Sequence, residues 1–437
     1  MKHFRSILLI LLAVLTAAGC SPKQSDTPGI TANAENTAGL DVNTSDEPAP
    51  REDDFDNRFG NQYDCVAETE DAVYFARMSG KYICYYDKDS GENGVLCAKP
   101  ECEHDEKPGN TGCDGYVDLN GVSLNYYGGK LYFVKNSSRA ESASGLSLMR
   151  MEPDGTGKEL VFRIDLPDEK YAPQRFYMHR GKLYGCNYTM GVTDGAPSQS
   201  ANVTSWDLET GEFSVVYEDT EFDGMPMVKL FFFDKYMYIC TYGVQYPEGN
   251  INSPVQKLTV NRWDTEKDSM EELYHSGSEG FPGGMSEIWV ESENEVYLTA
   301  VSPNDGCSRV YRLNRNEIEE MFAFDEPLIL HFVEGGVASA GCRDGQFFLK
   351  IKDLSGNTVY DGTCPSDSFR RFGDDYAFGG IFGVFGSTDR LYIAFSLEYV
   401  NENDADMKVY KSKECLLTYD LSSGEPVETY LCGSNRQ

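Results

Sequence analysis

The sequence has 437 residues, among them 38 basic and 71 acidic residues, and a formal net charge of −33. Such an acidic chain repels phosphate backbones and anionic lipid headgroups, which excludes nucleic acid as a partner and excludes direct binding to a membrane surface. The chain is long enough to bury a large core, and we expect a monomer.

Residues 1–19 have the pattern of a signal peptide. A basic start precedes an apolar run from Ile7 to Leu15, which is too short for a transmembrane helix of about 20 apolar residues. Small residues follow, and Ala17-Ala18-Gly19-Cys20 resembles the bacterial lipobox. This resemblance implies a diacylglyceryl group on Cys20 and cleavage before it. We therefore expect an extracytoplasmic protein that is anchored to the cell membrane only through this lipid.

The segment 20–60 is predicted to be a disordered tether. It is rich in Ser, Thr, Asn, Asp, Glu, Ala and Pro and has almost no large apolar side chain before Phe55. Such a composition buries too little surface to offset the entropy of ordering the chain. The folded part is expected to span residues 61–432, with a short tail at 433–437.

A strand motif recurs along the folded part, in which two polar residues precede Leu, Val or Met, then Tyr, then an apolar residue. Its six clear copies are EDAVYFA (70–76), GGKLYFV (128–134), RGKLYGC (180–186), DKYMYIC (234–240), ENEVYLT (293–299) and TDRLYIA (388–394). A degenerate copy lies in the remaining gap, either at 334–340 or at 344–350. The repeat of roughly 50 residues predicts seven similar structural units.

A second motif follows the first in each unit and predicts a β-hairpin. Its best copies are YDKDSGE (86–92), WDLETGE (206–212) and YDLSSGE (419–425). The Asp side chain accepts a hydrogen bond from the backbone two residues on, and Gly adopts the left-handed conformation that closes the loop. The predicted turn residues are Asp87, Gly91, Asp207, Gly211, Asp420 and Gly424.

Four short antiparallel strands per unit, repeated seven times, predict an all-β fold, a seven-bladed β-propeller. The chain resembles the bacterial seven-bladed propellers of the TolB-like and WD-repeat-like kind. The aromatic-Asp pair is similar to the Trp-Asp end of a WD repeat, although no Gly-His dipeptide precedes it. The many Tyr and Phe residues are expected to form the core between blades.

One segment between the first two units concentrates ligand-type residues. Residues 96–117 read LCAKPECEHDEKPGNTGCDGYV. Cys97, Cys102, His104 and Cys113 offer three thiolates and an imidazole, which together could close a tetrahedral structural Zn²⁺ site. No other cofactor is required by any motif in the chain.

Disulfide bonds are a competing interpretation of the same cysteines. Thiols tend to oxidise outside the cytosol, and twelve cysteines follow Cys20. In the two best hairpins, Cys84 and Cys97 lie three residues before and ten after Asp87. Cys415 and Cys432 lie five before and twelve after Asp420, so the offsets of both pairs have the same sum and predict the same cross-strand register. If these positions face each other, each pair can form a bridge, and Cys102 would pair with Cys113. We leave both interpretations open.

The cysteine segment also carries a family resemblance. Surface lipoproteins of Gram-positive anaerobes have a similar segment after a first propeller blade, matched here by Leu96, Cys97, Lys99, Pro100, Cys102, His104 and Cys113. The resemblance implies no particular activity. Because connections between blades often lie on the ligand-binding face of a propeller, we expect this segment to be pinned on that face, with a structural role only.

No catalytic motif of a hydrolase or a nucleotide-dependent enzyme is present. The few histidines are expected to be structural, and His179 is predicted to be a solvated turn residue. These observations favour a binding or scaffolding module for an envelope or extracellular ligand, which could be a glycan, a peptide or a protein. The alternative is a glycan-active enzyme that uses two carboxylates in the central funnel.

Overall fold

The computed structural model describes residues 54, 56 and 66–433, except for 77–81, 103, 105–111, 118–122, 137–144, 194–195, 250–252, 303, 315, 344–345, 366–370, 372, 374 and 401–412. The predicted signal peptide, Cys20 and most of the tether lie outside the described residues, as does the tail after Gly433. No helix within the described ranges is long and apolar enough to cross a membrane.

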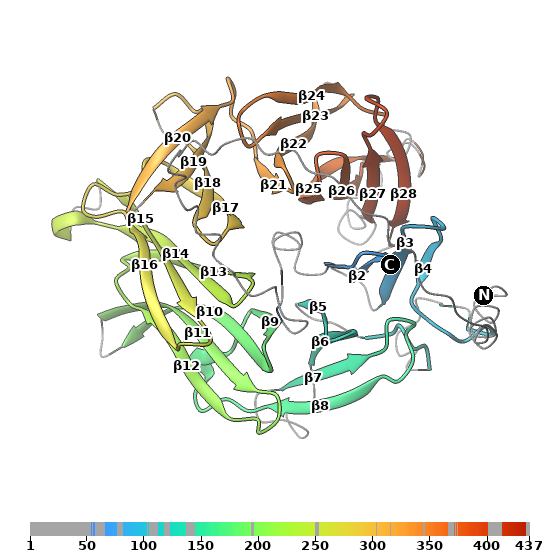
Figure 1. The fold of residues 1–437 in the computed structure, drawn as a ribbon, viewed down its shortest axis with the longest axis horizontal. Helices are drawn as coiled ribbons and strands as arrows, with labels where there is room; N and C mark the ends of the chain where they lie inside the picture. The colour runs from blue at the N-terminus through green and yellow to red at the C-terminus, as the bar shows by residue number, and fades with distance from the viewer. Residues whose placement is uncertain are drawn as a thin grey trace, which may run out of the picture. The chain divides into compact units, whose positions relative to one another are not determined.

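The described strands form seven antiparallel sheets, each made of four consecutive strands (Figure 1). Blades one to three comprise β1 (Val66–Glu68), β2 (Ala72–Ala76), β3 (Ile83–Asp87) and β4 (Asn93–Val95); β5 (Leu124–Tyr127), β6 (Lys130–Asn136), β7 (Leu146–Met151) and β8 (Glu159–Ile164); and β9 (Arg175–His179), β10 (Lys182–Thr193), β11 (Ala196–Asp207) and β12 (Phe213–Asp219). Two short 3₁₀ helices connect neighbouring strands, η2 (Glu169–Tyr171) and η3 (Pro247–Gly249).

The remaining four blades have the same order of strands. They comprise β13 (Gly224–Phe233), β14 (Tyr236–Gln245), β15 (Val255–Asp264) and β16 (Ser269–His275); β17 (Gly284–Ser292), β18 (Glu295–Val301), β19 (Ser308–Asn314) and β20 (Glu317–Ala323); β21 (His331–Val333), β22 (Gly336–Arg343), β23 (Gln346–Asp353) and β24 (Thr358–Thr363); and β25 (Tyr376–Gly386), β26 (Arg390–Tyr399), β27 (Lys413–Asp420) and β28 (Val427–Gly433). The predicted seven-bladed propeller is therefore confirmed.

The strand motif coincides with the turn between the first two strands of a blade and with its second strand. The degenerate copy is the one at 334–340, because its Val337 and Ala338 are buried in β22, the second strand of blade six. The alternative at 344–350 leads into β23, the third strand. Small buried residues replace the usual Tyr in this blade.

The second motif lies between the third and fourth strands. Asp87 Oδ1 accepts hydrogen bonds from the backbone N–H groups of Asp89 and Ser90, at 3.1 and 2.8 Å. Gly91 has a φ of +73°, in the left-handed region that favours glycine. Asp207 and Asp420 accept equivalent bonds, and Gly211 and Gly424 have φ values of +73° and +81°.

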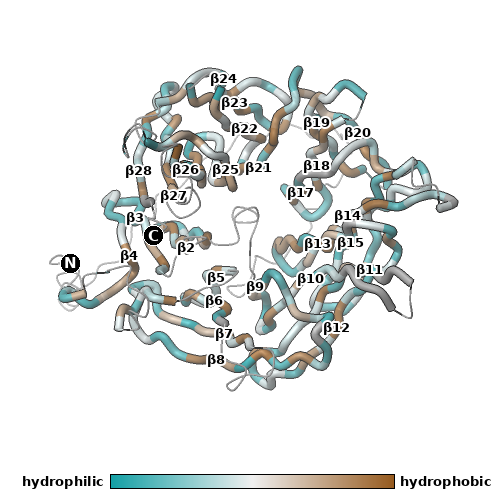
Figure 2. The backbone as a smooth tube through the Cα atoms, turned by 180° about the vertical axis from the view of Figure 1, so that it is seen from behind, coloured by the Kyte–Doolittle hydropathy of each residue, from teal (hydrophilic) through white to brown (hydrophobic). Residues whose placement is uncertain are grey.

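Figure 2 colours the strands by hydropathy. The buried residues form clusters between neighbouring sheets, whereas an outermost strand such as β16 is largely exposed. Side-chain packing also joins the first and last blades, because Phe385, Tyr392 and Leu416 of blade seven belong to the same buried cluster as Phe75 and Ile83 of blade one. No strand of one blade is exchanged into the other, so apolar contacts close the ring.

Candidate metal centre and ligand pocket

The four ligand-type residues of the segment 96–117 lie together. The ligand atoms of Cys97, Cys102, His104 and Cys113 are all within 4.8 Å of one another, and Cys113 Sγ is 3.6 Å from His104 Nδ1. A sulfur and a nitrogen bound tetrahedrally to one Zn²⁺ at their usual bond lengths are separated by about 3.6 Å. The donor set and its spacing therefore fit a metal ion of the zinc type.

Local backbone geometry brings these residues together. Cys97 comes directly after Leu96, whose N–H donates to the Ile83 carbonyl of β3 at 2.9 Å. A turn between Lys99 and Cys102 reverses the chain, closed by a hydrogen bond from the Cys102 N–H to the Lys99 carbonyl at 3.2 Å. His104 has a φ of +51°, which is uncommon for a residue with a side chain. Such conformations concentrate at functional sites.

The environment shifts the pKa values of two of the thiols in opposite directions. Burial raises the pKa of the Cys113 thiol to about 12. Burial also acts to raise the pKa of Cys97, but hydrogen bonds from the backbone N–H groups of Lys99 and Asp114 outweigh it and lower that pKa. Outside the cluster, Lys99 Nζ lies 2.9 Å from Asp114 Oδ1, so a lysine is held beside the sulfur atoms.

The register assumed for the hairpin disulfides does not occur. Cys84 is opposite Val95, not Cys97. Cys415 is opposite Gly433, because a bulge between Leu416 and Leu417 offsets the pairing by one residue. Without that bulge, the register near the turn would have placed Cys415 opposite Cys432. The structure contains Cys97, Cys102 and Cys113 as free thiols.

The cluster follows β4, the outermost strand of blade one. That its segment lies on the ligand-binding face stays a prediction. A pocket of about 660 Å³ is lined by other residues, which include turns that join innermost strands to their neighbours. The long connection from the outer strand of one blade to the inner strand of the next leaves the cysteines at the periphery.

His179 corrects another expectation. We predicted a solvated turn residue, yet its side chain is fully buried and its ring centroid lies 4.9 Å from that of Phe232 in blade four. The His179 side chain faces the neighbouring blade rather than water. His331 is also buried, and its Nδ1 lies 3.1 Å from Glu287 Oε1. Cys186 and Cys240 are buried core residues.

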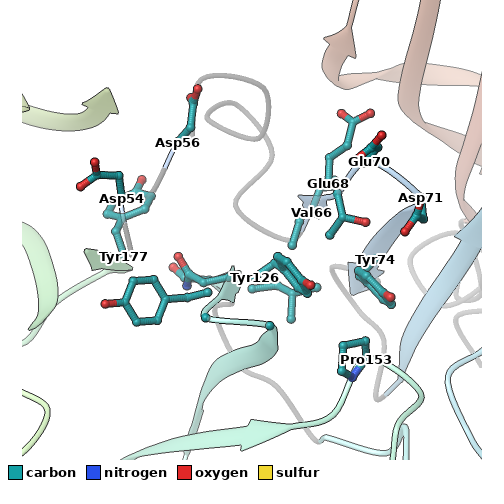
Figure 3. Close-up of a pocket in the computed structure, with 18 of the residues that line it drawn as sticks. Asp54, Asp56, Val66, Glu68, Glu70, Asp71, Tyr74, Tyr126, Pro153 and Tyr177 are labelled. Atoms are coloured by element: carbon teal, nitrogen blue, oxygen red, sulfur yellow. The ribbon is translucent and has the colours of Figure 1, made fainter. Parts of the chain in front are cut away.

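A pocket of about 660 Å³ lies at the turns of blades one to three, and we call it the mouth pocket (Figure 3). Its aromatic lining is Tyr74, Tyr126, Tyr127, Phe176 and Tyr177, and its acidic lining is Asp54, Asp56, Glu68, Glu70 and Asp71. The described residues that line it include no Lys or Arg. The pocket therefore combines ring faces with hydrogen-bond acceptors.

The side chains of the mouth pocket are held by their neighbours. The rings of Tyr74 and Tyr126 stack with centroids 6.3 Å apart and planes at 7°. Burial raises the pKa of Tyr74 to about 12, so its hydroxyl stays protonated and can donate. In Figure 3, Asp54 and Asp56 lie on the Tyr177 side of the pocket, and Glu68, Glu70 and Asp71 lie on the Tyr74 side.

Two of the carboxylates are anchored to the propeller by ion pairs. Both oxygens of Asp54 accept hydrogen bonds from Arg180, in the turn between β9 and β10, with a distance of 2.9 Å from Arg180 Nη2 to Asp54 Oδ2. Glu68 lies 2.7 Å from Lys88 Nζ. The Asp54 contact brings a residue of the predicted tether to blade three, so the chain before β1 contributes to the pocket.

Sequence reasoning missed the mouth pocket. Its residues range from Asp54 to Tyr177 and belong to three blades, and no local motif links them. A signal was nonetheless present, because the two residues that open each strand motif mark an inner turn. Glu70-Asp71 and Gly128-Gly129 are two such pairs, and both line the pocket.

No protein-family model matches the chain, and no curated protein matches its sequence. Three solved structures are similar to parts of the chain: a prolyl endopeptidase (14% identity, TM-score 0.48, 85% of this chain and 50% of that one); TolB from Acinetobacter baumannii (13%, 0.30, 84% and 78%); and YjhT (10%, 0.38, 72% and 98%). The match spans half the length of the prolyl endopeptidase chain. These similarities are weak, and the assignment of a seven-bladed propeller rests on the seven four-stranded sheets.

Proposed function

We propose that this protein is an extracytoplasmic, lipid-anchored β-propeller that binds an envelope or extracellular ligand in the mouth pocket. The observation that carries the proposal is the pocket of about 660 Å³ lined by tyrosines and carboxylates. Ligand sites of this size combine apolar or aromatic walls with a few polar groups that orient the ligand.

A glycan is the ligand class that this lining favours. The face of a tyrosine ring packs against the C–H face of a sugar, and carboxylates accept hydrogen bonds from its hydroxyl groups. Because the described lining includes five acidic residues and no Lys or Arg, phosphorylated or uronic-acid ligands would meet charge of the same sign there. A neutral glycan or an amino sugar meets no such repulsion.

Purified mature protein is expected to bind neutral or amino-sugar oligosaccharides and not uronic-acid oligomers, as measured by isothermal titration calorimetry. Tyr126→Ala removes the ring stacked on Tyr74 and should weaken binding about tenfold. Tyr399→Ala, which removes a ring of blade seven that packs on Tyr376 away from the pocket, should leave the affinity unchanged. Equal effects of the two variants would contradict the proposed site.

The second candidate function is a glycan-active enzyme. It is favoured by the carboxylates on both sides of the mouth pocket, because glycoside hydrolysis uses a pair of carboxyl groups that flank the scissile bond. Incubation of a bound oligosaccharide with the protein distinguishes the two functions. New reducing ends that disappear in a Glu70→Gln variant would establish the enzyme, whereas an intact oligosaccharide supports the binding module.

The lipid anchor is proposed on the lipobox-like residues at 17–20. We expect the Cys20→Ser variant to lose radiolabelled fatty acid and to move from the membrane fraction to the soluble fraction, because no thiol remains for acylation. Cys307→Ser, a change at a half-buried cysteine in the folded region, should keep both the label and the membrane association. Lipid labelling of the Cys20→Ser variant would refute the anchor.

The cysteine–histidine cluster is proposed to hold one structural Zn²⁺. Elemental analysis of purified protein is expected to find about one zinc per chain, and Cys113→Ser should lower this content because it removes the most buried ligand. The Cys307→Ser variant should retain the zinc. If the protein is free of metal and its mass increases on reduction, bridges occupy these cysteines instead.

A further inference from the structure

The peripheral cysteine segment contacts a turn that reaches the mouth pocket. This turn joins β7 to β8 in blade two, over residues 152–158, and we call it the linking turn. A Cβ atom added to Gly155, whose φ is +88°, would lie only 2.8 Å from the Leu96 carbonyl oxygen. The backbone of the linking turn is therefore packed directly against the residue that precedes Cys97.

Lys158 makes the second contact between the linking turn and the segment. Its Nζ donates to the carbonyl oxygens of Cys113, Asp114 and Tyr116, at 3.3, 3.0 and 2.7 Å. These three carbonyls converge on one ammonium group only while the segment keeps its present path. The Lys158 side chain is half-buried, so water competes poorly for the N–H groups of its ammonium.

The other end of the linking turn belongs to the pocket. Pro153 lines it, and Glu152 forms an ion pair with Lys130. Lys130 directly follows Gly128 and Gly129, which line the pocket in the turn between β5 and β6. Internal hydrogen bonds, such as Gly155 N–H to the Glu152 carbonyl at 2.9 Å, make the linking turn a single rigid piece.

Leu96 and Val117, the two ends of the segment, are buried in the core of blade one, but the described residues between them have few apolar contacts that could order them. The described buried cluster at this place contains only Tyr82, Cys113 and Tyr116, with Val95, Cys97 and Cys102 packed on it. Three of these six residues, Cys97, Cys102 and Cys113, belong to the ligand set and are fixed further if a metal is bound. Leu96 is held by its hydrogen bond to Ile83, so removing the metal mainly frees the Cys113 and Asp114 carbonyls that Lys158 contacts.

From these contacts we infer that the metal ion at the cysteine–histidine cluster regulates the mouth pocket, because the linking turn transmits the order of the segment to Pro153 and to the turn between β5 and β6. The metal acts as an effector of ligand binding from outside the pocket. This inference rests on the proposed zinc site and on the proposed pocket.

Hydrogen exchange of the mature protein tests the inference without a ligand. Amides of the linking turn and of residues 126–130 are expected to exchange about tenfold more slowly in the zinc-loaded protein than after chelation. The equivalent turn of blade three, residues 207–212, serves as the internal control and should exchange equally in both forms. Equal exchange of the linking turn with and without zinc would overturn the inference.

Two variants distinguish the coupling through the linking turn from metal binding itself. Lys158→Met keeps the zinc content, since Lys158 is no ligand, but should abolish the protection of residues 126–130 by zinc. Gly155→Ala pushes the turn off Leu96 and should have the same effect. Full zinc protection in both variants would overturn the inference. A protein that binds no zinc would overturn it too, whereas the Tyr126→Ala titration tests the pocket independently.

Discussion

Replacing Lys257 with alanine is expected to lower the free energy of unfolding by about 3–5 kcal/mol, because the change leaves a buried carboxylate without its counter-charge. Lys257 of β15 is 3% exposed, and its Nζ lies 2.9 Å from Oδ1 of Asp219, which ends β12 in the preceding blade. Thr241 donates to the same carboxylate at 3.0 Å. Chemical denaturation, followed by tryptophan fluorescence, measures the loss.

The matched control is Lys267→Ala. Lys267 forms an ion pair with Asp264 at 3.2 Å, but its side chain is 71% exposed, so the pair contributes little in water. Changing both buried partners, Lys257→Met with Asp219→Leu, should recover most of the stability, since it removes the unpaired charge. Equal losses for Lys257→Ala and Lys267→Ala would show that the buried pair has no special role.

Replacing Trp206 with alanine is expected to cost about 3–5 kcal/mol, as for other fully buried aromatic residues. Its ring is 1% exposed and packs against Phe213, with centroids 5.4 Å apart, and Phe176. Its Nε1 donates to the Asp165 carbonyl at 3.2 Å, and the truncation leaves that acceptor unpaired. The midpoint of chemical denaturation should fall accordingly.

Trp263→Ala is the natural comparison for this second change. Trp263 precedes the turn Asp of blade four just as Trp206 does in blade three, but its side chain is only half-buried. A clearly smaller loss is therefore expected. Equal losses of stability in both variants would contradict the prediction that the aromatic residue of the motif stabilises the fold in proportion to its burial.

The number of blades could be predicted because each blade is specified locally. Alternating apolar residues form the strands, and Asp87, Gly91 and their equivalents form the hairpin turns through contacts within a few residues. The degenerate unit was ambiguous because burial of small residues such as Ala338 satisfies the same strand position without the Tyr signal. The Tyr position of the motif is a buried strand position, and more than one type of residue can occupy it.

The candidate metal ligands could be recognised because all four lie close together in the sequence. Whether the predicted hairpin disulfides can form could not be predicted from the sequence, because strand register decides which cysteines face each other. One bulge between Leu416 and Leu417 moves Cys415 away from the predicted partner position, and no residue pattern announced it. Register is decided by packing across the whole sheet, not by the turn alone.

By itself, the sequence determined the repeat, the all-β class, the hairpin turns and the four clustered ligand residues, because each depends on contacts between near neighbours in the chain. Only the tertiary structure decided which turns meet at the mouth pocket and that His179 is buried. Asp54 reaches Arg180 across 126 positions of the chain. Such contacts arise when the blades pack around a common centre, which brings together residues that no local pattern connects.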